Sequence, residues 1–340
     1  MSRGPRPPAP GAGRAALAVA LLAAATLRCS EATAPADAAR AETITAADMR
    51  RWVERLADDS MRGRATPSPE IERAATTLGA YLAGLRLLPA FPAQAFVAHF
   101  PAPPYSVTDS APLVGAVLRG SDPALADEYV VVVAHLDAKG LVTPVGTDSI
   151  CNGADDNASG SAGVLELAEA FAGTAPHPRR SLLFLLVSGE EHGLWGSQWY
   201  VDHPSVPLAS IVAVVNLDMI SRNDPGALQV GGLDLSTLGT TVAQAALAHP
   251  EVRLTLSPGQ TTGSDQVPFW SKGIPFVFLF AGLHADYHRP TDEPATIDAD
   301  KAARVARLAF FAALTTANAD ARPEWLTAAA PPAAAREHAP

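Results

Sequence analysis

Cysteine is scarce in this chain of 340 residues, which contains only Cys29 and Cys151. Two cysteines cannot build a disulfide framework, so hydrophobic burial must hold the fold together, and a chain of this length can bury enough apolar surface to do so. We expect Cys151 to be a buried structural cysteine; the alternative is a soft metal ligand or a redox group.

Basic residues are also few, with 25 lysines and arginines against 35 acidic residues and a net charge of −10. The first 29 residues hold four of the arginines and no acid, so the remainder carries 21 − 35 = −14. An acidic chain without a basic stripe argues against nucleic acid or an anionic membrane surface as a partner. The sequence also shows no internal repeat.

The apolar stretch at residues 15–27 is too short to span a bilayer and follows three arginines. This pattern is typical of an export signal, which we place at residues 1–29. Cys29 is then a candidate lipid anchor, although Arg28 stands where a small residue is expected, so simple secretion is the alternative. We therefore expect an exported protein that is periplasmic, extracellular or lipid-anchored to the envelope.

Composition divides the rest of the chain into three parts. Residues 30–43 are rich in alanine and proline and predict a linker, and residues 319–340 return to that composition and predict a disordered tail. Between them, residues 44–318 are expected to form one domain. Thr45 with Asp48, and Ser68 with Pro69, are helix-start signals near its beginning.

Within this domain, apolar runs without alternation predict buried strands at residues 130–133, 182–187, 211–215 and 276–280. Helical periodicity separates them at residues 159–171, 235–248 and 265–271, and a last helix is expected after Asp298. Strands that alternate with helices indicate an α/β fold, with a doubly wound, mostly parallel central sheet flanked by helices.

Acidic and imidazole side chains follow each of these strands or lie on the loop after it. They are His135 and Asp137, Glu190 and Glu191, Asp218, and His288, and a further pair, Asp155 and Asp156, precedes a helix. Open α/β sheets build their sites at this edge. Imidazole and carboxylate ligands suit two divalent ions, and a further carboxylate is needed to take a proton from water.

Each segment taken alone has a simpler explanation. The acids at 155–156 could form an Asx turn before a helix, and Asp218 could be a helix cap. Glu190 and Glu191 could be a solvated loop end, and His288 an ordinary surface histidine. The metal-site hypothesis is favoured because independent strand ends would otherwise carry ligand-type residues by coincidence.

Taken together, these segments resemble the di-zinc aminopeptidase family of peptidase clan MH, which also holds glutamate carboxypeptidases, transferrin-receptor-like proteins and glutaminyl cyclases. The matching strings are "AHLDAKG", "NGADDNASGSAG", "SGEEHGLWGS", "NLDMIS", "GSDQVPF" and "YHRPTDE". The resemblance implies a zinc-exopeptidase-like fold and two Zn²⁺ ions per chain.

The resemblance also implies a role for each ligand. Asp156 would be the carboxylate that bridges the two zinc ions. His135 and Asp218 would complete one zinc site, and Glu191 and His288 would complete the other. The family can hold a cis peptide bond directly after the bridging acid, which in this chain is the bond from Asp156 to Asn157.

Among the remaining residues, Glu190 would be the general base and Asp137 would orient His135. Ser264 and Asp265 resemble residues of the substrate cleft, although capping of the following helix explains them equally well. No tyrosine precedes Ser264, so Tyr287 is the candidate oxyanion donor. One departure is Gln266, which stands where many relatives have histidine.

The function expected from these residues is a secreted zinc aminopeptidase that acts on peptides or proteins with a free N-terminus. A second hypothesis is a glutaminyl-peptide cyclase that uses one zinc. A third is a carboxypeptidase, for which Arg222, Lys272 and Arg289 are the basic residues near the motifs. The last is a non-catalytic binding module, which the full set of ligands argues against.

Overall fold

The computed structural model of the protein describes residues 35–102, 109–173, 176–257 and 263–326. The chain forms two units, Met1–Ala39 and Arg40–Pro340. Only the start of helix α2 (Pro35–Ala41) represents the first unit among the described residues, and the expected export signal at residues 1–29 lies outside them. In the described part of the chain, no helix combines the length and apolar character needed to cross a bilayer.

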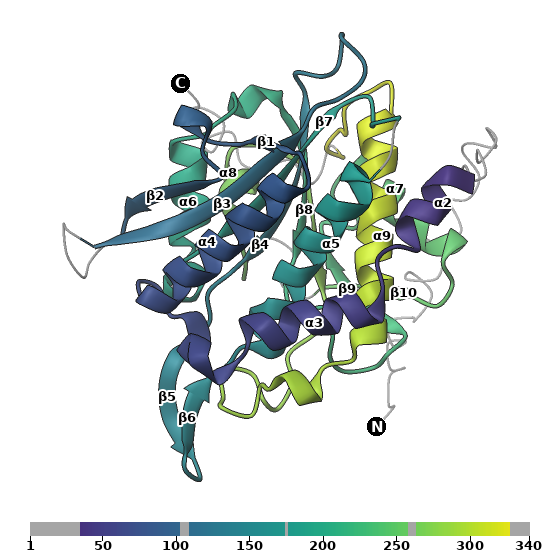
Figure 1. The fold of residues 1–340 in the computed structure, drawn as a ribbon. Coiled ribbons are helices and arrows are strands. Elements are labelled where there is room, and N and C mark those ends of the chain that lie inside the picture. The colour runs from purple at the N-terminus through teal and green to yellow at the C-terminus, as the bar shows by residue number, and fades with distance from the viewer. Residues whose placement is uncertain (1–34, 103–108, 174–175, 258–262, 327–340) are drawn as a thin grey trace, which may run out of the picture. The chain divides into compact units, whose positions relative to one another are not determined.

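The second unit is built on a nine-stranded mixed sheet with the order β1-β3-β7-β4-β8-β11-β9-β10, in which β2 also pairs with β3 (Figure 1). The strands are β1 (Leu88–Pro89), β2 (Val97–Pro101), β3 (Ser110–Leu118), β4 (Tyr129–His135), β7 (Ser181–Val187), β8 (Ile211–Leu217), β9 (Ala227–Gly231), β10 (Arg253–Leu256) and β11 (Phe276–Phe280). A separate hairpin of β5 (Gly140–Val145) and β6 (Asp148–Cys151) extends away from this sheet.

Helices cover both faces of the sheet, as the expected α/β fold requires. The α-helices of the second unit are α3 (Ala46–Leu56), α4 (Pro69–Gly84), α5 (Gly160–Ala172), α6 (Trp195–Asp202), α7 (Thr237–Ala248), α8 (Gln266–Ser271) and α9 (Ala299–Asn318). One hydrophobic core joins α3, α4, α5, α7 and α9 to the sheet, and a second core joins α6 and α8 to the opposite face. Strand β4 shows the division, because Val130 and Val132 belong to the first core and Val131 and Val133 to the second.

Local sequence explains where these elements begin. Thr45 caps α3 by accepting a hydrogen bond from the Asp48 amide at 3.1 Å, and Ser68 caps α4 by accepting one from Ile71 at 3.1 Å. Asp298 does the same for α9, with the Lys301 amide at 2.8 Å. All residues of β7 and β8 are buried, which explains their continuous apolar runs.

The sheet is parallel only in part. Strands β7, β4, β8 and β11 pair in parallel, as expected, and β9 and β10 are also parallel. However, β3 is antiparallel to β7 and β9 is antiparallel to β11. The predicted mostly parallel central sheet is therefore confirmed for the strands that carry the candidate ligands, and the flanking strands, which were not predicted, make the whole sheet mixed.

Both predicted unstructured segments contain ordered residues. Helix α2 falls inside the expected linker at residues 30–43. The expected tail begins later than residue 319, because Trp325 pairs with Ser236 in a β-bridge and packs against Phe276. The Trp325 Nε1 also donates a hydrogen bond to the Gly273 carbonyl at 2.8 Å. A large aromatic side chain thus fixes residues that composition alone assigned to disorder.

Candidate metal centre

The carboxyl ends of three neighbouring parallel strands deliver the candidate ligands to one edge of the sheet. His135 is the last residue of β4, and Asp218 directly follows β8. Glu190 and Glu191 lie in a 3₁₀ turn three residues after β7, which ends at Val187. Because parallel strands end at the same side of the sheet, residues that are far apart in sequence meet there.

The first cluster consists of His135, Asp156 and Asp218, all of which are buried. The His135 Nε2 lies 3.4 Å from Asp156 Oδ1 and 3.4 Å from Asp218 Oδ1. One imidazole nitrogen thus faces two carboxylates that come from different segments of the chain.

The second cluster consists of Asp156, Glu191 and His288. The His288 Nε2 lies 3.2 Å from Asp156 Oδ2 and 2.9 Å from Glu191 Oε2. Asp156 therefore belongs to both clusters and turns one carboxylate oxygen toward each.

These donor sets fit zinc. With zinc–ligand bonds of roughly 2.0–2.2 Å, neighbouring ligands of a tetrahedral ion are about 3.3 Å apart, and the ligand atoms of each cluster lie within 4.8 Å of one another. Among the described residues, Glu191 Oε1 is buried without a hydrogen-bond partner, and Asp156 Oδ2 accepts no hydrogen bond although His288 Nε2 lies 3.2 Å away. Buried carboxylate oxygens are costly unless a cation or a donor meets them, so the chemistry of the site calls for bound metal.

Glu190 lies beside the clusters but in neither of them. Its backbone amide donates a hydrogen bond to Asp137 Oδ1 at 3.4 Å, and its side chain lines the cavity described below. Burial raises the pKa of Glu190 to about 10; Asp218 adds to this rise, whereas His135 opposes it. A metal cation at the neighbouring clusters would favour the ionised carboxylate that a general base requires.

Asp137, which the resemblance assigned to orienting His135, lies beside that ring. The His135 Nδ1 is 3.2 Å from the Asp137 backbone carbonyl and 3.6 Å from the Asp137 Oδ1. The carbonyl is therefore the nearer acceptor for the ring, and the Asp137 carboxylate also receives the Glu190 amide. Asp137 thus connects the first ligand to the candidate base.

Two further acids support the ligand-bearing loops. Sequence reasoning grouped Asp155 with the candidate ligand Asp156, and it gave Asp292 no role. Asp292 accepts hydrogen bonds from the backbone amides of Asp155 at 3.0 Å and Asp156 at 3.0 Å. Asp155 is fully buried and accepts hydrogen bonds from the amide of Ser221 at 2.8 Å and from its hydroxyl at 2.6 Å. Asp292 lies in the string "YHRPTDE", but nothing in the sequence pattern separates a loop-supporting acid from a ligand.

Lys139 lies beside the second ligand cluster, and the sequence did not indicate it. Its Nζ lies 3.4 Å from Glu191 Oε2 and donates a hydrogen bond to the Glu191 carbonyl at 3.0 Å. It follows β4 by four residues, so the loop that carries Asp137 also reaches the second cluster.

The bond from Asp156 to Asn157 is cis, as the resemblance suggested it could be.

A cavity of about 500 Å³ opens beside the ligands. Its described lining combines three acids with apolar and small polar residues: Asp156, Glu190, Asp218, Met219, Gln229, Ser257, Gly263, Phe278, Phe280, Leu283 and Tyr287. Tyr287 stacks on the His288 ring with centroids 3.7 Å apart, which places the tyrosine at the border between metal site and cavity.

The other two candidate substrate residues lie in the interior and are absent from the described cavity lining. The Ser264 hydroxyl accepts a hydrogen bond from Asn216 Nδ2 at 2.9 Å, and Asp265 accepts one from Ser197 Oγ at 2.5 Å. Asp265 also makes no side-chain cap for α8, so the capping explanation is not supported either. Gln266 is fully buried and accepts a hydrogen bond from Asn216 at 2.9 Å.

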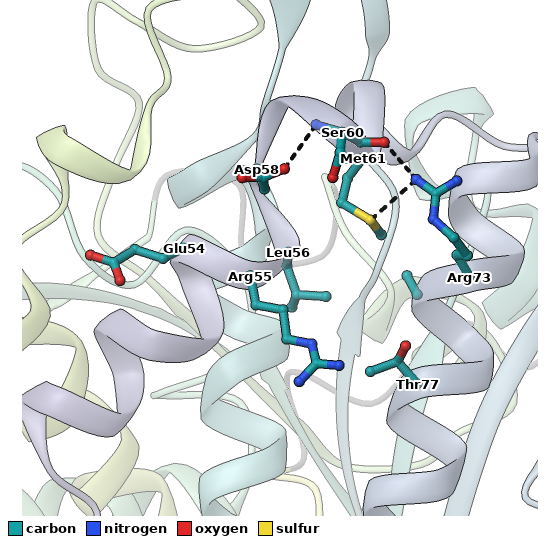
Figure 2. A pocket seen from close by; sticks show the side chains of 9 residues that line it. Glu54, Arg55, Leu56, Asp58, Ser60, Met61, Arg73 and Thr77 are labelled. Atoms are coloured by element: carbon teal, nitrogen blue, oxygen red, sulfur yellow. Dashed lines mark hydrogen bonds between the residues drawn. The ribbon is translucent and has the colours of Figure 1, made fainter.

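Cys151 is a buried free cysteine at the end of β6 and belongs to neither ligand cluster. A second hollow of about 370 Å³ lies between α3 and α4 and is drawn in Figure 2. None of the candidate ligands is among the residues that line it. The metal-type chemistry of the described residues is therefore gathered at the strand ends.

Comparison with known proteins agrees with this arrangement. The sequence profile of peptidase family M28 matches residues 114–313, which include every residue of both clusters. The chain belongs to peptidase family M28. The match covers more than half of the chain and extends from within β3 to beyond β11.

Among similar proteins, the leupeptin-inactivating enzyme 1 of Streptomyces exfoliatus is 39% identical over 145 residues, which are 41% of this chain and 32% of that protein. The probable lipoprotein aminopeptidase LpqL of Mycobacterium tuberculosis is 29% identical over 209 residues, 53% of this chain and 41% of that protein. The chain thus matches less than half the length of these relatives. The Legionella pneumophila LapA aminopeptidase structure has a TM-score of 0.67 at 20% identity, covering 83% of this chain and 74% of that one, and shares the fold.

Proposed function

We propose that this M28 chain is a zinc aminopeptidase that holds two zinc ions and removes amino acids from peptides or proteins with a free N-terminus. The observation that carries the proposal is the position of Asp156, whose two carboxylate oxygens face different ligand clusters. His135 and Asp218 would complete one zinc site, and Glu191 and His288 the other.

Bound zinc would supply Lewis-acid polarisation of the scissile carbonyl and would lower the pKa of a bound water. The side chains of this protein would do the rest. Glu190, beside both clusters, would take a proton from the attacking water and return it to the leaving amine. Asp137 would keep His135 and the Glu190 amide in place, and the adjacent cavity would receive the N-terminal side chain.

Two features favour an aminopeptidase over a carboxypeptidase. The described cavity lining includes three acids and none of Arg222, Lys272 and Arg289. Arg222 is engaged by Asp286 at 2.5 Å, and Lys272 lies 3.5 Å from Asp202. These three acids are the proposed zinc ligands Asp156 and Asp218 and the proposed base Glu190, and the rest of the described lining is uncharged. Recognition of a terminal carboxylate calls for a cationic side chain, which the described lining does not offer.

Export is part of the proposal. Residues 1–29 would be the leader and residues 30–43, which include helix α2, would follow it. The peptidase domain would begin at residue 44 and include Trp325. The name of the mycobacterial relative, a probable lipoprotein aminopeptidase, supports a lipid anchor at Cys29. Fractionation of expressing cells, with Cys29→Ser beside the native chain, tests this: the anchor predicts membrane-bound native protein and a released variant.

The activity is tested by incubating zinc-loaded protein with a panel of aminoacyl-anilides. Glu190→Gln should bind as much zinc as the native protein and lose about 10²–10⁴-fold in kcat, as expected for removal of a general base. Glu54→Gln, a substitution at the rim of the hollow between α3 and α4, is the matched control and should keep full activity.

Each outcome has a distinct meaning. A fully active Glu190→Gln protein would refute the assigned base. Zinc-loaded native protein that cleaves no anilide would refute the aminopeptidase, and peptides with N-terminal glutamine or a free C-terminus would then test the cyclase and carboxypeptidase alternatives.

A further inference from the structure

Arg64 is a fully buried arginine that donates hydrogen bonds to backbone carbonyls from separate parts of the chain. Its Nε donates to the carbonyl of Leu136 at 2.9 Å. Its Nη1 donates to Asn152 at 2.9 Å and also to Leu56, and its Nη2 donates to Gly153 at 3.1 Å. One guanidinium therefore joins α3, the loop after β4 and the residues after β6.

The carbonyls that Arg64 contacts lie next to the candidate ligands in sequence. Leu136 stands between His135 and Asp137, and Gly153 is three residues before Asp156. These two segments supply the imidazole and the shared carboxylate of the first cluster, and the candidate ligand atoms His135 Nε2 and Asp156 Oδ1 are 3.4 Å apart. A shift of either loop would change that separation.

The turn that carries Arg64 is itself closely fitted. Arg62, Gly63 and Arg64 all have positive φ angles, of 46°, 69° and 45°. A Cβ on Gly63 would lie 2.3 Å from the Cys151 carbonyl and 2.7 Å from the Gly140 Cα, so only glycine allows the turn to approach the base of the hairpin this closely.

The other side of the same turn is held by polar contacts, which Figure 2 shows. Asp58 accepts a hydrogen bond from the Ser60 amide at 2.9 Å. Arg73 reaches across from α4 and donates to the Ser60 carbonyl at 2.5 Å. Arg64 is thus presented from a fixed turn rather than from a free loop.

We propose that Arg64 is a positioning residue of the metal centre, which sets the spacing between the segments of His135 and Asp156 through their backbone carbonyls. The inference rests on the proposed function, because it concerns the same ligands. A guanidinium offers five donors in a planar fork, whereas a lysine ammonium is a single flexible point charge. Burial lowers the pKa of Arg64 to about 10, so the side chain remains charged at neutral pH.

The test compares Arg64→Lys with a matched control, Arg180→Lys. Arg180 is also buried, and it donates to the Thr316 carbonyl at 3.2 Å and to Glu128 at 2.6 Å. Among the described residues, none of its side-chain hydrogen-bond partners lies in a segment that carries a candidate ligand. Both substitutions keep the charge and leave buried carbonyls without donors, so both should lower the midpoint of thermal unfolding.

Only Arg64→Lys should alter the metal site. Competition titration with a chromogenic chelator should show at least a tenfold loss of zinc affinity in Arg64→Lys and less than a twofold change in Arg180→Lys. The visible absorption spectrum of the cobalt-loaded protein, which reports ligand geometry, should change in the first variant alone. Equal zinc affinities and spectra in both variants would overturn the inference.

A measurement on the native protein decides the question if Arg64→Lys does not fold. In NMR spectra the Arg64 Nε–H signal should shift when metal-free protein is titrated with zinc, and the Arg180 Nε–H signal should stay in place. An unchanged Arg64 signal would contradict the proposal. Native protein that binds zinc but cleaves no aminoacyl substrate would refute the proposed function and leave this inference standing.

Discussion

Glu166 provides a sharp test of the packing between α3 and α5, because it is an acid that the fold buries. The residue is 2% exposed, and its Oε1 accepts a hydrogen bond from Trp52 Nε1 at 3.1 Å. Burial raises the pKa of Glu166 from 4.5 to about 8; Asp48 and Glu169 add to the rise, and Arg51 opposes it. We therefore expect the folded protein to prefer the protonated carboxyl.

The sign of the pH dependence follows from linkage. Because the folded pKa lies above the unfolded value, the folded state binds the proton more tightly. The stabilising contribution is complete below about pH 4.5 and is lost as the pH rises to about 8. A difference of about 3.5 pKa units, at 1.36 kcal/mol each, sets the full loss at about 5 kcal/mol.

Glu166→Gln removes this titration and leaves an oxygen that can still accept the Trp52 hydrogen bond. Urea unfolding of metal-free native and variant protein at pH 5, 7 and 9 measures the effect. The variant should gain several kcal/mol in free energy of unfolding, relative to the native protein, between pH 5 and pH 9. Glu54→Gln, at the rim of the hollow between α3 and α4, should show no such trend. A constant difference between native and Glu166→Gln protein across this range would refute the reasoning.

Three other predictions follow from the site and the chain end. Asp156→Asn should remove both zinc ions and His288→Ala only one, measured as metal per chain after dialysis; equal losses would contradict a shared ligand. The apolar cavity wall should favour leucyl- over glutamyl-anilide by at least about tenfold in kcat/KM, and equal rates would contradict this. Trp325→Ala should lower the free energy of unfolding by about 2 kcal/mol, because the Trp325 ring packs on Phe276. An unchanged urea midpoint would instead support the prediction of a disordered tail.

The centre of the fold was predictable because its strands are buried on both faces. In runs such as residues 182–187, apolar residues do not alternate with polar ones, which is typical of a buried strand. The structure contains β7 at Ser181–Val187. The flanking strands were missed for physical reasons. Strand β3 contains Pro112 and Gly115, which weaken a strand pattern, and β10 is four residues long and mostly exposed. Such strands form because the backbone of a neighbouring strand is available for hydrogen bonding.

The candidate ligands were predictable because metal chemistry restricts residue types and strand ends restrict position. The residues that hold those ligands in position are not restricted in type or place in this way, so no sequence pattern marks them. Asp292 could not be recognised as an acceptor for the Asp155 and Asp156 amides, because a carboxylate in a polar loop fits many roles. Ser264 and Asp265 were assigned to the cleft from their motif, yet the structure places both in the interior. A motif thus locates a segment near the site without stating which way each side chain points.

Arg64 shows why the supporting residues are harder to find than the ligands. Its partners are backbone carbonyls, which every residue has, so no residue type at Leu136, Asn152 or Gly153 records the contact. The string "MRGR" contains its turn, but the requirement for glycine at position 63 comes from the hairpin base 77–88 residues later in the chain. The candidate ligands can therefore be recognised from side-chain types in the sequence. The spacing of the ligands depends on backbone contacts, which become visible only in the folded structure.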